Sequence, residues 1–249
     1  FLYEVDEAIE GFGYQKDPRV QEIIHGRGRI REDLAEVFGV EPSRISLTRT
    51  EALSGSIAFH YGDLGLSNLT RAEGLTFPAR VGGILDLSGL TSADGLVFPT
   101  RVGGHVNLST LTSVEGLRLP DYVGGHVNLG DLTLAEELRL PEYVGGHVNL
   151  SNLTRAEGLR LPAYVGDDLY LSSLTSARGL ALPVHIGGSL DLRALTSVEG
   201  LTLPAHVETY LILKNLTSAA GLSLPTNFSG GLYLSGLTSA VGLNLPTNF

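Results

Sequence analysis

Three histidines recur at one place in a repeated sequence, and imidazole nitrogens are common ligands of transition metals. His105, His126 and His147 lie 21 residues apart, each inside the unchanged hexapeptide GGHVNL. If the copies stack as neighbouring strands, the three rings lie about 4.8 Å apart, which is close enough to chelate a metal ion. No carboxylate completes the set within those three repeats. We therefore expect a row of polar surface side chains, with no metal and no other cofactor.

Asparagines follow the histidines two residues further along each copy. The sequence predicts that their amides hydrogen-bond along the stack, next to the imidazoles, at Asn107, Asn128 and Asn149.

Arginines and tyrosines form two further rows in the same repeats. The arginines are Arg118, Arg139 and Arg160, and the tyrosines are Tyr122, Tyr143 and Tyr164. Both residue types are frequent anchors of protein interfaces, so these rows are candidates for binding a partner. Alternatively, the arginines pair with the acidic column Glu115, Glu136 and Glu157, which would relieve the repulsion between stacked like charges.

No combination of residues typical of an enzyme departs from the repeat. The chain has no cysteine, and no Ser/His/Asp set or phosphate-binding loop stands out. The acidic pair Asp167-Asp168 lies on adjacent residues, whose side chains point to opposite faces of a strand. We therefore expect a protein that is not an enzyme.

A threonine recurs at Thr112 and at every equivalent position from Thr70 to Thr238. Ice-binding solenoids also carry threonine rows, but they need a flat face with two paired rows. Here the residue two positions on is an inward-facing alanine or valine. We expect each hydroxyl to satisfy a backbone group at a corner of the chain.

The period of the repeat is marked by prolines. Pro78, Pro99 and their successors through Pro246 are each 21 residues apart, with no insertion between them. A fixed period of this length is typical of a solenoid, in which each repeat forms one coil that is stable only when stacked on its neighbours.

Apolar residues at fixed columns predict the core of each coil. In one copy they are Val106, Leu108, Leu111, Val114, Leu117, Leu119 and Val123. The spacing of two within Val106/Leu108 and within Leu117/Leu119 predicts two short strands with these side chains inward. The wider gaps, including Pro120–Val123, indicate corners.

The pattern V-G-G-x-L-x-L-x-x-L-T-S-x-E-G-L-x-L-P resembles leucine-rich repeats, especially the receptor L-domain type, over residues 63–249. The resemblance implies a mainly β fold: a right-handed parallel β-solenoid of about nine 21-residue coils. It also implies a recognition or scaffold module that binds a protein, peptide or glycan through the outward residues of the first strand. Unlike extracellular relatives, this chain lacks cysteines.

Residues 1–62 precede the regular array and are predicted to form a small helical cap with irregular first strands. Amphipathic spacing predicts a helix that begins at Ile30 and stops at Gly39, after shorter helices in residues 1–25. The stretch LAEVFGVEPSRIS also resembles the middle of a bacterial helix-turn-helix domain, through Leu34, Ala35, Gly39, Val40, Ser43, Ile45 and Ser46. DNA binding is a minor alternative, because residues 1–62 carry seven Lys/Arg against eleven Asp/Glu.

The net charge of −10 disfavours nucleic acid and anionic membranes as partners, and no apolar run is long enough to span a membrane. The compartment stays open between the cytoplasm and a bacterial cell surface.

The absence of methionine suggests a processed or trimmed start, and no signal peptide is visible. The array stops at Phe249 without a polar cap, so a self-assembling structural protein that forms dimers or filaments through this end is the alternative function.

Overall fold

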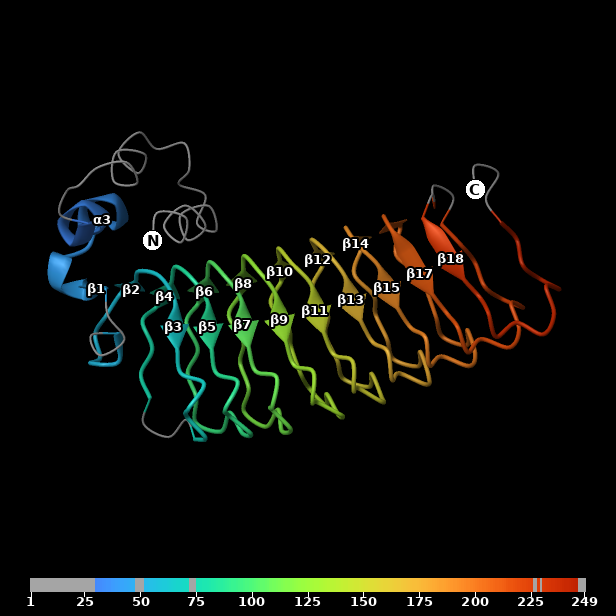
Figure 1. Cartoon of the computed structure of the whole chain (residues 1–249), viewed down its shortest axis with the longest axis horizontal. Helices are drawn as coiled ribbons and strands as arrows, with labels where there is room; N and C mark the ends of the chain where they lie inside the picture. The colour runs from blue at the N-terminus through green and yellow to red at the C-terminus, as the bar shows by residue number, and fades with distance from the viewer. Residues whose placement is uncertain (1–29, 48–51, 72–74, 226–227, 229, 246–249) are drawn as a thin grey trace.

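The computed structural model describes residues 30–47, 52–71, 75–225, 228 and 230–245. They wind into an elongated parallel β-solenoid with a small helix at its N-terminal end (Figure 1). This confirms the predicted fold class. The shorter helices expected in residues 1–25 lie outside the described residues.

One parallel sheet, sheet B, runs along the length of the solenoid (Figure 1). Its nine strands in the described part of the chain enclose eight full turns, close to the predicted number of coils. They are β3 (Leu64–Gly65), β5 (Leu85–Asp86), β7 (Val106–Asn107), β9 (Val127–Asn128), β11 (Val148–Asn149), β13 (Leu169–Tyr170), β15 (Leu190–Asp191), β17 (Tyr210–Ile212) and β18 (Gly231–Tyr233).

A second parallel sheet, sheet A, is formed by the residues that follow the repeating proline. Its nine strands among the described residues are β1 (Ile45–Ser46), β2 (Phe59–His60), β4 (Arg80–Val81), β6 (Arg101–Val102), β8 (Tyr122–Val123), β10 (Tyr143–Val144), β12 (Tyr164–Val165), β14 (His185–Ile186) and β16 (His206–Val207). β1 and β2 fall within residues 1–62, so sheet A begins inside the region predicted as a cap.

The prediction for the second strand of each coil was wrong. Residues 117–119 form no strand, and the column that contains Arg118 is joined only by isolated bridges such as Arg139↔Arg160. The strand lies instead at Tyr122–Val123, where a corner was expected. The predicted inward direction of the leucines holds, because Leu117 is buried and Leu119 is partly buried.

The core of the solenoid is one continuous column of mainly aliphatic side chains. Val106, Leu108, Leu111 and Val123 are fully buried, and Val114 packs at the edge of the same cluster. Strands pair in strict register, as in Val106↔Val127 and Val148↔Leu169, so each apolar residue stacks on its equivalent in the next coil. This register also places every outward side chain in a row along the solenoid.

The helix α3 (Ile30–Phe38) covers the first strands of sheet A. Leu34 and Ala35 are buried against Ile45 and Phe59, and Gly39 ends the helix with a φ of +64°. A short 3-10 helix, η1 (Pro42–Arg44), follows.

The start of a recognition helix is absent, because β1 (Ile45–Ser46) pairs with β2 at the place where a helix-turn-helix motif would begin that helix. Residues 48–51 of the motif lie outside the described part. Among the described residues, no helix is long and apolar enough to cross a membrane.

Candidate recognition surface

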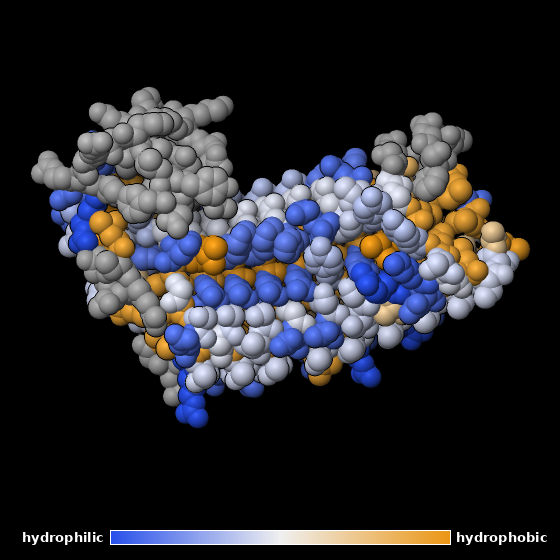
Figure 2. Space-filling view, in the orientation of Figure 1, coloured by the Kyte–Doolittle hydropathy of each residue, from blue (hydrophilic) through white to orange (hydrophobic). Residues whose placement is uncertain are grey.

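The three histidines form a stack on sheet B, where two parallel hydrophilic rows cross the central strands (Figure 2). The ring centroids of His105 and His126 are 4.1 Å apart with 3° between planes. Those of His126 and His147 are 3.5 Å apart with 12° between planes.

The imidazoles bond to the backbone of the next coil. The N–H groups of Gly125 and His126 both face the preceding coil, and the carbonyl of Gly104 accepts the bond from Gly125 at 3.0 Å. The N–H of His126 donates instead to Nδ1 of His105 at 2.8 Å, and the N–H of His147 donates to Nδ1 of His126 at 2.9 Å. The side chain at this position therefore supplies an acceptor that the backbone lacks.

Aspartates perform the same task elsewhere in the row. Oδ1 of Asp63 accepts the N–H of Ile84 at 2.7 Å, and Oδ1 of Asp168 accepts the N–H of Ser189 at 2.6 Å. The property that His and Asp share here is an acceptor atom bonded directly to Cγ, which is Nδ1 in histidine and Oδ1 in aspartate.

The bonding pattern fixes the protonation state of two histidines. A backbone N–H can only donate, so Nδ1 of His105 and His126 carries the lone pair and Nε2 carries the hydrogen. Burial, followed by the neighbouring His105 and His147, lowers the pKa of His126 to about 4, although Asp167 acts in the opposite direction. The imidazole of His126 is therefore neutral near pH 7.

The carboxylate of Asp167, in the coil that follows His147, lies close to this stack. His126, His147 and Asp167 place potential metal-ligand atoms within 4.8 Å of one another, and Nδ1 of His147 lies 3.7 Å from Oδ2 of Asp167. However, the lone pair of His126 is already used by the backbone. This leaves two side chains with ligand atoms, fewer than the three or four of protein zinc sites. The arrangement favours a structural stack over a metal site.

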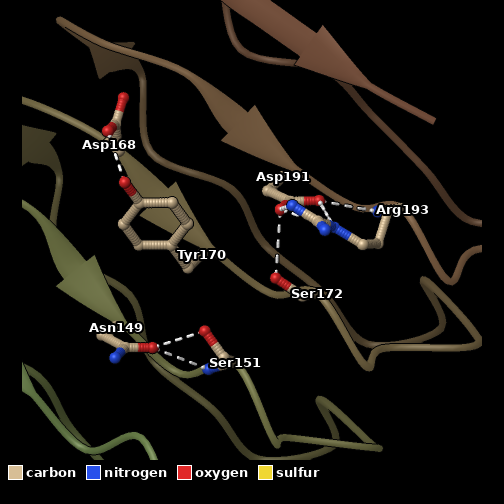
Figure 3. Close-up of polar contacts among 7 residues, drawn as sticks. All are labelled: Asn149, Ser151, Asp168, Tyr170, Ser172, Asp191 and Arg193. Carbon is tan, nitrogen blue, oxygen red and sulfur yellow. Dashed lines mark hydrogen bonds and ion pairs between the residues drawn. The ribbon is translucent and has the colours of Figure 1, made fainter. Parts of the chain in front are cut away.

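The asparagine row is also hydrogen-bonded within the protein. Nδ2 of Asn149 donates to Oδ1 of Asn128 at 3.1 Å, which confirms the predicted amide bond along the stack. Each Oδ1 also accepts the backbone N–H two residues further on, as Asn149 does from Ser151 at 3.0 Å (Figure 3). Asn107 and Asn128 make the same bond, with Ser109 and Gly130.

The histidine row and the asparagine row both change residue type in the next coil, where Asp168 and Tyr170 take these positions. The hydroxyl of Tyr170 donates to Oδ2 of Asp168 at 2.6 Å (Figure 3). This bond, together with burial, raises the pKa of Tyr170 to about 12. Burial alone would raise the pKa of Asp168, but the bonds from Tyr170 and Ser189 outweigh it and hold that pKa below its usual value.

The next coil contains a buried carboxylate. Asp191 is 1% exposed and accepts hydrogen bonds from the guanidinium of Arg193 and, at 3.1 Å, from the hydroxyl of Ser172 (Figure 3). These bonds hold Arg193 against sheet B.

Exposed aromatic side chains follow in the last two strands of sheet B. Tyr210 and Tyr233 are 46% and 44% exposed, with ring centroids 5.5 Å apart and planes at 56°. The ammonium of Lys214 lies 5.6 Å from the ring of Tyr233. Hydrophobic and hydrophilic surfaces adjoin near these strands (Figure 2). We name this region the C-terminal patch and define it as Asp168, Tyr170, Arg193, Tyr210, Lys214 and Tyr233.

The predicted tyrosine row forms a second stack, on sheet A. The rings of Tyr122, Tyr143 and Tyr164 lie 5.0 Å apart with planes within 2°, and His185 continues the stack at 4.8 Å. The guanidinium of Arg101 covers the first ring at 4.2 Å. Because neighbours cover the ring faces, this stack offers a partner mainly ring edges and hydroxyls.

The arginine row is exposed and in register. Among the described residues, Arg118, Arg139 and Arg160 make no ion pair with the acidic column. The pairing expected as an alternative is therefore not observed.

The threonine hydroxyls bond to the backbone, as predicted. Oγ1 of Thr112, Thr154 and Thr238 donates to the carbonyl of the equivalent threonine in the preceding coil, at 3.2, 3.1 and 3.1 Å.

Each predicted group of residues is brought together in its own row. However, Nδ1 of His105, Nδ1 of His126 and the side-chain oxygens of the asparagines already accept hydrogen bonds from within the protein. None of the site residues predicted from the sequence belongs to the C-terminal patch. Its signal is the loss of the GGHVNL pattern in the coils after residue 166. Compared with known proteins, the chain matches no protein family, no curated protein and no solved structure.

Proposed function

We propose that this protein is a non-catalytic recognition module that binds a protein, peptide or glycan through the C-terminal patch of sheet B. One observation carries the proposal. At Asp168 the outward residues change from a repetitive, internally bonded stack to a varied set of aromatic and charged side chains, of which Arg193, Tyr210, Lys214 and Tyr233 are exposed.

The composition of the patch supports a role in binding. Tyrosine and arginine contribute much of the energy of protein interfaces, since they combine a large apolar surface with hydrogen-bonding groups. Arg193 and Tyr170 are held by hydrogen bonds to Asp191 and Asp168, which reduces the conformational entropy lost on binding.

The carboxyl groups of Asp168 and Asp191 do not fit the role of a general acid, which supports a non-catalytic role. A general acid needs a raised pKa, whereas the pKa of Asp168 is lowered. Asp191 is buried and its carboxylate is hydrogen-bonded to the guanidinium of Arg193, so it is not available to a substrate.

The tyrosine stack and the arginine row of the central coils are a second candidate face. The arginines favour it, because they are exposed and without ion pairs among the described residues.

Binding to glycan and peptide arrays tests the proposal. The double variant Tyr210→Ser/Tyr233→Ser should lose most binding that the unchanged protein shows, whereas Tyr143→Ser should retain it. Loss in Tyr143→Ser alone would move the site to the second face. Loss in neither variant would exclude both faces.

Self-assembly is tested separately by light scattering over a concentration series. A recognition module gives a constant mass, whereas assembly through a solenoid end gives a mass that grows with concentration.

A further inference from the structure

The coil that spans residues 124–144 departs from the repeat at two neighbouring turn positions. Leu134 replaces a serine, and Glu137 replaces a glycine. Arg155 replaces the same serine in the following coil. None of these residues belongs to either sheet or to the C-terminal patch.

The serine has a structural role wherever the structure shows it. Its hydroxyl accepts the backbone N–H two residues further on, at Ser92, Ser113, Ser176, Ser197, Ser218 and Ser239. Neither Leu134 nor Arg155 can accept this bond. Leu134 is instead 49% exposed, which gains little from the hydrophobic effect.

Glu137 adopts a backbone conformation that favours glycine. Its φ is +62°, and the equivalent residues in neighbouring coils are Gly116 and Gly158, with φ of +70° and +78°. A side chain with a Cβ is strained in this region. The coil thus gives up stability at Leu134 and again at Glu137.

These departures adjoin one surface hollow. A cavity of about 240 Å³ is lined by Leu134, Ala135, Glu136, Arg155 and Glu157. In the described part of the chain, Glu136, Arg155 and Glu157 form no ion pair, so their charges are open to a ligand. Glu137 is the next residue after Glu136 in the chain but does not line the hollow.

We infer that this hollow is a second binding site, which takes a peptide segment with an apolar side chain next to a lysine or arginine. The apolar side chain packs on Leu134, and the cationic one pairs with Glu136 and Glu157. The guanidinium of Arg155 donates to the carbonyls of the peptide. The excess of carboxylates and the net charge of −10 favour a cationic partner.

The test uses three fluorescein-labelled peptides in which one leucine is flanked by lysine, by glutamate or by serine, and measures fluorescence anisotropy. The intact chain should prefer the lysine-flanked peptide. A variant that restores the repeat, Leu134→Ser/Glu137→Gly/Arg155→Ser, should bind that peptide at least about tenfold more weakly. The Tm of this triple variant should nevertheless be higher than that of the unchanged protein. The Glu137→Gly change alone should contribute about 2–4 °C of the increase.

Two variants serve as controls. Arg71→Ser makes the same change as Arg155→Ser at the equivalent position of an earlier coil, and should leave binding intact. Gly221→Glu places a glutamate at a φ of +85° in a distant coil, and should lower the Tm without affecting binding. Equal binding of the three peptides, no binding, or full binding by the restored variant would each overturn the inference.

Discussion

The row on sheet B that contains His105, His126 and His147 also contains Asp63 and Asp168. Which of the two residue types is used depends on whether adjacent coils need the same acceptor. Asp63 and Asp168 each accept a backbone N–H with a charged oxygen, and none of their neighbours in the row, Ile84, His147 and Ser189, carries a carboxylate. Three successive carboxylates at strand spacing would repel one another. Neutral imidazoles accept the same bond and stack face to face, which explains their use in consecutive coils.

Replacement of His126 tests this acceptor role. His126→Leu removes the partner of the His147 N–H, and we expect a loss of about 1 kcal/mol in the free energy of unfolding. His126→Asp keeps an acceptor and should lose less. Urea denaturation followed by far-UV circular dichroism measures both, and equal stability of the leucine variant and the unchanged protein would contradict the role.

Acid should destabilise the protein through the same residue. The pKa of His126 is about 4 in the folded protein and 6.5 ordinarily. Between these values the unfolded chain binds a proton that the folded chain does not, so the free energy of unfolding falls as the pH drops from 6.5 to 4. Well above pH 6.5 this residue contributes no pH dependence.

The measurement is the stability of the unchanged protein and of His126→Asn over this pH range. The difference should shrink or reverse toward pH 4, because asparagine does not titrate. A constant difference would show that His126 protonates equally in both states. His105, His147 and Asp167, which lie next to His126, are present in both proteins.

At the scale of strands and turns, the paired glycines allow the coils to approach closely. A Cβ at Gly145 would overlap the carbonyl oxygen of Gly124, and one at Gly124 would overlap that of Gly103. The close contact lets strands only two residues long continue their hydrogen bonds through the turn, as from Gly146 to Gly125.

Gly145→Ala should therefore be costly, with about 1–3 kcal/mol lost from the free energy of unfolding because the coils must separate locally. Gly65→Ala is the matched control, since nothing lies within 4 Å of the added Cβ. Thermal denaturation of both variants tests this. Similar Tm values would mean that the coils are not held at this distance.

The sequence was sufficient to predict the solenoid, its period and its core, because apolar columns such as Val106 and Leu108 recur without gaps. It could not place the strand at Tyr122–Val123. That strand is two residues long and directly follows Pro120 and Asp121, which are typical of a turn. The acceptor role of His126 could not be predicted from the sequence either. It arises because the N–H groups of Gly146 and His147 both face the preceding coil, where the carbonyl of Gly125 accepts only the first. The C-terminal patch could be seen only as a departure from the repeat.

At the scale of the whole molecule, each coil contacts mainly its two neighbours, so a complete coil should be dispensable. Deletion of residues 103–123 joins Val102 to Gly124 and recreates the native junction. We expect a folded protein with cooperative unfolding and a Tm within a few degrees of the original.

Deletion of residues 103–112 is the control, because it removes half a coil and shifts the register of everything that follows. Circular dichroism should show loss of structure in this variant only. If the full-coil deletion also unfolds, the coils depend on contacts beyond their nearest neighbours.

The parallel register of both sheets also has a mechanical meaning. The hydrogen bonds between coils lie along the long axis, so a pull on the two ends loads successive layers in series, and the weakest layer yields first. Each layer that detaches releases one coil of 21 residues, about 70 Å of extended chain. Under tension the molecule should therefore lengthen in equal steps rather than in one event, and the length of a step is set by the repeat.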